Sequence, residues 1–544
     1  MIARLATALA AALVSLCAPQ PQPPMTPAEQ VAANSVRGHV EFLADDQLEG
    51  RDTGSRGHEI AAHYVASRFR EMGLEPGGPA GSWFAQVPLR RATIVQPTPA
   101  ITLTLNGRQQ KLAWARDVAL RPSLTERHRA IDARLVFVGY GLDEPLLGLD
   151  DYRGLDAKGA IVVSLAGAPR GLASEVAAHL TSAKAETAAA HGAIGLIEVG
   201  GEGRLASDVA ADASRATTNW VAPDGSSGEI PLRARLSLSK AWQAKLFEGS
   251  PKTLAALRSE AATASPRGFP LYARASIVAD TAWTDFTSPE VIGRLPGADP
   301  VRALENVVLM AHLDHLGVKP DARPGEDHIY NGALDNAAGV ATMLEAAREF
   351  VASGRRPARS VLFIANTGEE KGLLGADYFA AHPTVPIASI ISVVDLDMPL
   401  PLYDFTDVTA FGAEHSTVAH TVAQAGAAMG IRVSPDPMPQ ETIFVRSDHY
   451  RFVQKGVPAI LLMTGYANGG EAVWTQFMAK VYHSPADDLS QPISWRALAR
   501  YGMLNYGIAR ALADAPDRPR WYANDYFGDR FAPGQTRAVR GSGG

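Results

Sequence analysis

Three short apolar runs in the second half of the chain predict buried strands. They occupy residues 306–311, 360–365 and 390–394, and none of them contains a charged side chain. A continuous apolar run of this length is typical of a parallel strand that is covered on both faces. Between the first two runs, apolar side chains recur at helical spacing over residues 336–350. Strand, helix and strand in alternation predict a doubly wound α/β fold, with helices on both faces of a mixed, mostly parallel sheet.

Other regions show other patterns. Near the amino end, residues 36–43 and then residues 60–72 have the spacing of amphipathic helices, with Gly-rich sequence between them. From about residue 110 the pattern changes to short apolar stretches separated by turns, such as 135–141 and 158–163. This pattern predicts a β-rich insert, and a last long helix is predicted over residues 494–513.

These patterns divide the chain into six expected segments. They are a signal peptide at 1–18, a Pro-rich linker at 19–27, the first part of the main domain at 28–114, the insert at 115–280, the larger part of the main domain at 281–515 and a carboxyl-terminal tail at 516–544. A chain of 544 residues with 46% hydrophobic residues is long enough for two or three domains with substantial cores.

The first 18 residues have the pattern of a secretory signal peptide. Arg4 is followed by an apolar run that ends at Leu16, and this run is too short for a lasting membrane span. We therefore expect a secreted or periplasmic protein. Cys17 is the single cysteine of the chain, but a lipid anchor on it is disfavoured, because Leu16 stands where such signals place a small residue. The formal net charge of −6 indicates no nucleic-acid partner.

Side chains that bind metals follow the predicted strands. Histidine and carboxylate side chains recur, in order, after the three strands, at a helix entrance and near the carboxyl end: His312 and Asp314, Asp335, Glu369 and Glu370, Asp397, and His483. Imidazole and carboxylate are ligands that Zn²⁺ accepts, and α/β sheets place their sites at the carboxyl ends of strands. Five acids in one cleft would repel one another unless cations lay between them. Two Zn²⁺ ions would supply four positive charges.

The series resembles the M28 family of zinc peptidases, the group of aminopeptidase Y and bacterial leucyl aminopeptidase. The resemblance implies that His312, Asp335 and Asp397 hold one zinc and that Glu370, His483 and the shared Asp335 hold a second. It further implies a three-layer α/β/α zinc-peptidase sheet with a protease-associated domain as the insert. The start of the first domain, around residues 48–54, also resembles this family.

The same resemblance implies three residues that act beside the metals. Glu369 would be the general base that takes a proton from a metal-bridging water, Asp314 would steady His312, and Tyr482 would face the developing oxyanion. The chain departs from the family at one place: Leu334 replaces the first acid of a Gly-Ala-Asp-Asp-Asn motif, while the ligand position Asp335 is kept. The neighbouring histidines, His315, His328 and His449, are expected to be loop or supporting residues.

We thus expect a zinc-dependent exopeptidase that acts on the free amino end of a peptide. A carboxypeptidase would need a basic clamp for the terminal carboxylate, and near the motifs the sequence offers only Arg323 and Arg446, which are not clustered. The alternatives are a carboxypeptidase or a glutaminyl-cyclase-like enzyme with the same ligands, and a receptor-like binding protein without catalysis. The insert is expected either to narrow the cleft or to bind a partner. Oligomeric state is not predicted.

Overall fold

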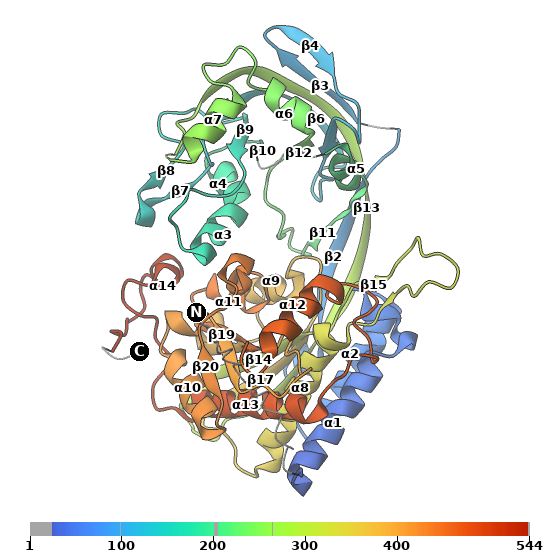
Figure 1. The fold of residues 1–544 in the computed structure, drawn as a ribbon, viewed down its shortest axis with the longest axis vertical. Helices are drawn as coiled ribbons and strands as arrows, with labels where there is room; N and C mark the ends of the chain where they lie inside the picture. The colour runs from blue at the N-terminus through green and yellow to red at the C-terminus, as the bar shows by residue number, and fades with distance from the viewer. Residues whose placement is uncertain (1–23, 98, 201–204, 264, 542–544) are drawn as a thin grey trace, which may run out of the picture.

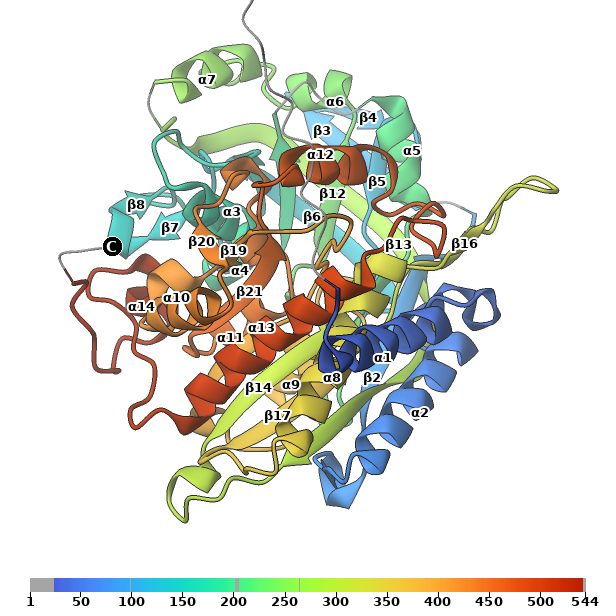
Figure 2. The same ribbon diagram turned by 60° about the horizontal axis from the view of Figure 1, so that its bottom comes forward.

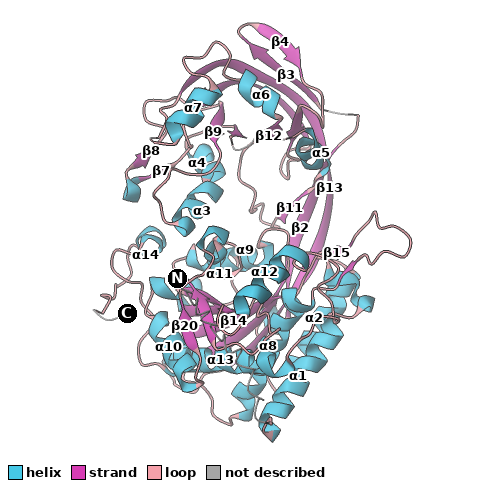
Figure 3. Cartoon of the chain, in the orientation of Figure 1, coloured by secondary structure: helices cyan, strands magenta, loops and turns pink. Residues whose placement is uncertain are grey.

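The computed structural model describes residues 24–541, apart from residues 98, 201–204 and 264. The predicted signal peptide lies outside the described residues. Two long antiparallel strands, β2 (Phe84–Ile94) and β13 (Phe269–Leu295), join a main body to an insert that lies within residues 95–280. Figure 3 shows β13 curving from one part into the other. Because β13 takes part in two sheets, main body and insert are linked by a paired ribbon and not by a single flexible strand.

The main body is built on a mixed sheet whose centre is parallel. Its central strands β17, β14, β18 and β21 lie side by side and run in one direction, whereas β13 and β19 pair with them in the antiparallel sense. The strands of this sheet are β1 (Glu75–Pro76), β11 (Thr217–Trp220), β17 (Ser360–Asn366), β14 (Asn306–His312), β18 (Ile390–Asp395), β21 (Ala459–Thr464), β19 (Asp407–Phe411) and β20 (Arg432–Ser434), in addition to β2 and β13. The three predicted strands are confirmed as β14, β17 and β18.

Helices cover both faces of this sheet. On one face α8 (Ala338–Ala352) and α13 (Trp495–Asp514) pack against β14, with α1 (Pro27–Leu43) against both of them and α10 (Val418–Ala428) beside α13. Figure 2 shows α1, α8 and α13 on this face. On the opposite face α11 (His449–Val453) packs against β18, β21 and α9 (Leu374–Ala381). The expected three-layer α/β/α fold is confirmed. The remaining elements of the main body are α2 (Arg56–Glu71), α12 (Gly470–Lys480), α14 (Tyr526–Phe531), β15 (Gly317–Val318) and β16 (Ile329–Tyr330).

The insert contains a second sheet, which is built on the first half of β13. Its strands run in the order β4, β3, β13, β6, β9, β10, β12 and β5. Their bounds are β3 (Ala100–Leu105), β4 (Arg108–Lys111), β5 (Val118–Leu120), β6 (His128–Phe137), β9 (Ile161–Leu165), β10 (Gly195–Val199) and β12 (Ala234–Leu238). A small hairpin, β7 (Asp143–Glu144) and β8 (Leu149–Asp150), and the helices α3 (Ser174–Ser182), α4 (Lys184–Ala190), α5 (Ala206–Ser214), α6 (Lys240–Lys245) and α7 (Leu254–Ala261) complete it. The sheet takes in residues before 115 because β3 pairs with β13.

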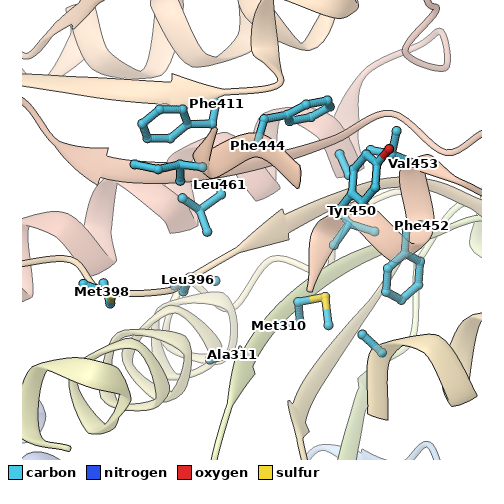
Figure 4. Packing of buried hydrophobic residues seen from close by; sticks show 14 of the residues in the cluster. Met310, Ala311, Leu396, Met398, Phe411, Phe444, Tyr450, Phe452, Val453 and Leu461 are labelled. Atoms are coloured by element: carbon cyan, nitrogen blue, oxygen red, sulfur yellow. The ribbon is translucent and has the colours of Figure 1, made fainter. Parts of the chain in front are cut away.

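Apolar burial fixes the central strands in place. Figure 4 shows part of this core, in which Met310 of β14, Leu461 of β21 and Phe411 of β19 gather with the aromatic rings of residues 444–452. Every residue of β14, β17 and β18 is buried. The strand ends are therefore rigid, and side chains that follow them are held at fixed positions. Among the described residues, no helix has the length and apolarity that a membrane crossing requires.

Candidate metal centre

The carboxyl ends of β14, β17 and β18 bring the predicted ligands together. His312 is the last residue of β14, Glu369 and Glu370 follow β17, and Asp397 lies two residues beyond β18. Since β14 pairs with both β17 and β18 in parallel, these three ends meet at the same edge of the sheet.

Two more elements add the remaining ligands. Asp335 lies in the turn Ala333–Ala337, which leads directly into α8, so a helix entrance positions it as expected. His483 follows α12, and its side chain is 35% exposed, the largest value in the cluster. The structure thus brings together all five predicted metal ligands.

The distances divide these five side chains into two sets that share Asp335. His312 Nε2 lies 3.2 Å from Asp335 Oδ1 and 3.2 Å from Asp397 Oδ1. His483 Nε2 lies 3.2 Å from Asp335 Oδ2 and 3.3 Å from Glu370 Oε2. Each oxygen of the Asp335 carboxylate therefore faces a different imidazole, as a bridging ligand between two cations would.

The spacing of these donor atoms fits zinc. Two ligand atoms about 2.0–2.1 Å from a tetrahedral Zn²⁺ lie about 3.3 Å apart. The four nitrogen to oxygen distances of the two sets match this separation. In addition, the second nitrogen of His312, Nδ1, lies 3.0 Å from the Asp314 carbonyl oxygen, which fixes the ring with Nε2 toward the cluster. The residues present therefore suit two zinc ions.

A sixth residue, Asp487, positions the turn that carries Asp335. Its carboxylate accepts hydrogen bonds from the backbone N–H groups of Leu334 and Asp335, both at 2.9 Å. Asp487 is fully buried. Sequence reasoning missed it, because Asp487 is one of two consecutive acids in a stretch that resembles a solvated loop. Leu334, the departure from the family motif, is also fully buried and contributes its backbone N–H to this contact.

Arg51 ties the loops beneath the centre to one another. Its guanidinium donates to the carbonyl oxygens of Leu313, Asn331 and Gly332, and also to that of Leu43. It is 1% exposed, and burial lowers its pKa to about 10, although nearby acids, Asp487 first among them, oppose this shift. A structural cation thus lies under the acidic cluster, a role that the sequence did not reveal.

Asp314 contacts the loop of Glu369 more directly than it contacts His312. Its carboxylate accepts the backbone N–H of Glu369 at 3.2 Å and the hydroxyl of Thr53 at 2.8 Å. Only its backbone carbonyl meets His312. The carboxylate of Asp314 therefore holds the general-base candidate in position, and the expected contact with the histidine runs through the main chain.

Burial and mutual charge govern ionisation in the cluster. Burial raises the pKa of Glu369 well above its usual range, and the charge of Glu370 adds to this, although His312 opposes it. Burial also opposes ionisation of Asp335, but the surrounding imidazoles, His315 first, hold its pKa well below the usual range. Burial lowers the pKa of His483, whereas its hydrogen bonds to Asp335 and Glu370 raise it to about 10. Protons and metal cations therefore compete for the same groups.

A partly apolar pocket adjoins the cluster. Asp335, Glu369, Asp397, Tyr482 and His483 line it together with a wall of mainly apolar side chains: Met398, Met438, Ile443, Met463, Trp474 and Met478. The ring of Tyr482 stacks on His483 at a centroid distance of 3.8 Å. Burial raises the pKa of the Tyr482 hydroxyl, and the acids of the cluster raise it further, so this phenol keeps its proton.

The other histidines and arginines near the motifs occupy different positions. His315 Nδ1 lies 2.7 Å from Glu370 Oε1, so Glu370 is held between His315 and His483. His449 contacts the buried Asp395 beneath Asp397, and His328 is exposed. Arg323 and Arg446 are also exposed, and Arg446 lines the pocket and is ion-paired with Glu441 at 3.4 Å.

Comparison with known proteins finds a family match within the main body. Residues 290–509 match the model of Peptidase family M28. Leupeptin-inactivating enzyme 1 of Streptomyces exfoliatus is 29% identical over 218 residues, which cover 38% of this chain and 44% of that protein. A vacuolar membrane protease of Yarrowia lipolytica is 34% identical over 100 residues, or 18% of this chain and 9% of the relative. The chain thus matches less than half the length of these curated relatives.

Solved structures align with different shares of this chain. The aminopeptidase from Aneurinibacillus sp. strain AM-1 aligns over 89% of this chain and 95% of its own, with 20% identity and a TM-score of 0.48. The glutaminyl cyclase of Porphyromonas gingivalis aligns over 41% of this chain and 78% of its own, with 19% identity and a TM-score of 0.33. The family that the motif series predicts is confirmed for residues 290–509, which contain all five predicted metal ligands.

Proposed function

We propose that the protein is a two-zinc aminopeptidase. The observation that carries this proposal is the shared carboxylate: Asp335 places one oxygen 3.2 Å from His312 Nε2 and the other 3.2 Å from His483 Nε2. A single buried carboxylate between two imidazole sets supports a pair of metals, and the adjacent Glu369 supports catalysis, because binding alone would not require a base. His312, Asp335 and Asp397 would hold one zinc, and Glu370, His483 and Asp335 the other.

Zinc at this position would polarise the scissile carbonyl and lower the pKa of water from about 15.7 toward roughly 7. Glu369 would accept the proton of the attacking water and deliver it to the leaving amine. Its backbone is fixed by Asp314, and its carboxyl lines the pocket beside Asp335 and Asp397. The Tyr482 hydroxyl, which stays protonated, would donate a hydrogen bond to the developing oxyanion.

The pocket supports specificity for the amino end. A free α-ammonium suits the carboxylates of Glu369 and Asp397, which face the pocket. Arg446, the arginine at its rim, is already paired with Glu441, and Arg323 is exposed on a loop, so neither serves as a clamp for a terminal carboxylate. The apolar wall further favours an apolar first residue, such as Leu or Met, because burial of its side chain removes apolar surface from water.

The experiment measures the metal content of the protein and determines which end of a substrate must be free. Purified protein should carry close to two zinc ions per chain, lose activity to a chelator and regain it with zinc. It should release p-nitroaniline from leucine p-nitroanilide but not from the N-acetylated compound, because acetylation removes the ammonium. Release of the last residue from an N-blocked dipeptide would instead identify a carboxypeptidase, and cyclisation of an amino-terminal Gln a cyclase. Zinc binding without turnover of any of these substrates would favour the binding protein.

The proposal includes secretion and the nature of the insert. The first 18 residues would be removed on export, which amino-terminal sequencing of the secreted protein tests. The insert would be a protease-associated domain that limits access to the centre.

A further inference from the structure

Two arginines of the insert face each other across neighbouring strands. Arg235 lies in β12, and Arg121 follows the last residue of β5, the antiparallel partner of β12. The backbone N–H of Arg121 donates to the Arg235 carbonyl at 2.9 Å, which sets the two residues opposite each other. Like charges in this arrangement destabilise a sheet.

These guanidinium groups make no close ion pair among the described residues, although the charge of the partly buried Glu229 acts on both Arg121 and Arg235. Within the part of the chain that the structure describes, the side chains of Arg121, Arg235 and the nearby Arg215 form no salt bridge and no hydrogen bond, and the backbone carbonyl of Arg121 accepts a hydrogen bond from the Arg129 guanidinium. The Arg121 Nε is buried without any partner. Glu198 lies beside them but is paired with the buried Lys184 at 3.4 Å.

The three arginines line one pocket, which we call the arginine pocket. Lys371 of the main body closes it on another side, and the hydroxyl-bearing residues Thr217, Thr218 and Ser237 add polar groups to its wall. Figure 1 shows β11, which begins at Thr217, running beside β2 where insert and main body meet. The pocket is therefore lined by residues of both parts of the molecule.

Lys371 connects this pocket to the metal centre. It directly follows Glu369 and Glu370 in the chain, and its ammonium is held by Asp52 Oδ1 at 2.7 Å. The rim of the arginine pocket is thus one residue from a predicted zinc ligand. An extended peptide advances about 3.3–3.6 Å per residue, so the length of a substrate that is bound by its amino end at the metals would decide whether its far end meets the pocket.

We propose that the arginine pocket binds the carboxylate at the far end of a short peptide substrate. The planar guanidinium fork matches a carboxylate with two parallel hydrogen bonds, and Arg121 and Arg235 offer two such forks side by side. The insert then takes part in substrate recognition and selects peptides by length. This inference rests on the proposed aminopeptidase function, because it places the amino end of the same peptide at the metals.

The test compares peptides that differ only in their terminal charge. Leucine release is measured from Leu-Gly peptides of two to six residues, each as the free acid and as the amide, with leucine p-nitroanilide as a substrate without a carboxylate. The enzyme variants are Arg121→Gln and Arg235→Gln. Arg108→Gln removes the same charge from the exposed edge strand β4 of the same sheet and is the matched control. Thermal unfolding of each variant establishes that it is folded.

We expect the wild-type KM for the free acid to be about tenfold lower than for the amide at one favoured length, as for hydrogen bonds to a charged group. Both pocket variants should remove this difference and leave p-nitroanilide hydrolysis unchanged, whereas Arg108→Gln should keep it. Equal KM values for acids and amides at every length would overturn the proposal. So would a variant Arg235→Gln that changes KM for the free acid and for the amide by the same factor. Phosphate binding that Arg235→Gln abolishes, without any acid preference, would reveal a site for a free anion and also overturn it. If the wild type did not hydrolyse leucine p-nitroanilide, that result would instead refute the aminopeptidase function.

Discussion

Asp487→Asn is the sharpest test of how the centre is held together. The carboxylate of Asp487 accepts two backbone N–H groups, those of Leu334 and Asp335, each at 2.9 Å. Asparagine has one carbonyl oxygen and an NH₂ group, so one of the two buried N–H groups loses its acceptor. A buried donor without a partner costs about 1–3 kcal/mol.

The change also removes a charge from the interior. Burial raises the pKa of Asp487 to about 6, and the charge of Asp335 adds to this shift. A carboxyl with a raised pKa is costly to ionise in the fold, and a shift of about two units corresponds to about 3 kcal/mol at neutral pH. The gain from removing the charge and the loss of the hydrogen bond are similar, so the free energy of unfolding of the zinc-free protein should change little.

Zinc affinity, by contrast, should fall. Two Zn²⁺ ions attract the Asp487 carboxylate, which the variant lacks, and the Asp335 side chain is less well placed in the variant. Loss of such a supporting contact lowers metal affinity by about 10- to 100-fold. The assay is competition with a chelator in zinc-buffered solution, beside urea unfolding of the zinc-free protein. Asp488→Asn is the control, since its carboxylate binds only the backbone and hydroxyl of Ser490. Wild-type zinc affinity in Asp487→Asn, or an equal loss in Asp488→Asn, would refute the reasoning.

Three further predictions concern other parts of the structure. Glu369→Gln should retain zinc while kcat falls by about 10² to 10⁴, because the amide cannot accept a proton, and zinc loss in this variant would assign it as a ligand. Arg51→Lys should lower the free energy of unfolding in urea by about 3 kcal/mol, since one ammonium cannot replace a fork that binds carbonyls on separate loops. Burial lowers the pKa of His415, but its hydrogen bonds to Asp525 and Glu175 raise it to about 10, so its contribution to stability is complete below about pH 6.5 and lost as the pH rises through 10. The stability difference between wild type and His415→Gln should therefore shrink over that range, and a constant difference would contradict this.

The sequence predicted those parts of the site that depend on local order along the chain. His312, Glu370 and Asp397 follow apolar strands, and a strand of this kind can be recognised from its own residues. Parallel pairing of the three strands then brings their ends to one edge, so prediction of the strands was enough to group the ligands.

Contacts between distant segments could not be predicted in this way. Arg51 binds carbonyl groups of residues 313, 331 and 332, which lie more than 260 positions away, and the carbonyl is present in every residue, so the sequence carries no signal for its partners. Asp487 is the first of two consecutive acids in a stretch that resembles a solvated loop. Only the fold shows that one of the two carboxylates turns inward.

The insert illustrates the same limit on a larger scale. Arg121 and Arg235 are separated by more than a hundred residues and are ordinary surface residues in a linear reading. The structure makes them neighbours because β5 pairs with β12, and it brings Lys371 of the main body to the same pocket. In the sequence, the arginines near the metal motifs are Arg323 and Arg446. The residues of a carboxylate clamp need to be close in space, however, and not in sequence. The pairing of the insert's strands therefore places the arginines that we propose to recognise the far end of a substrate. Substitution of these arginines, not of the motif residues, tests that recognition.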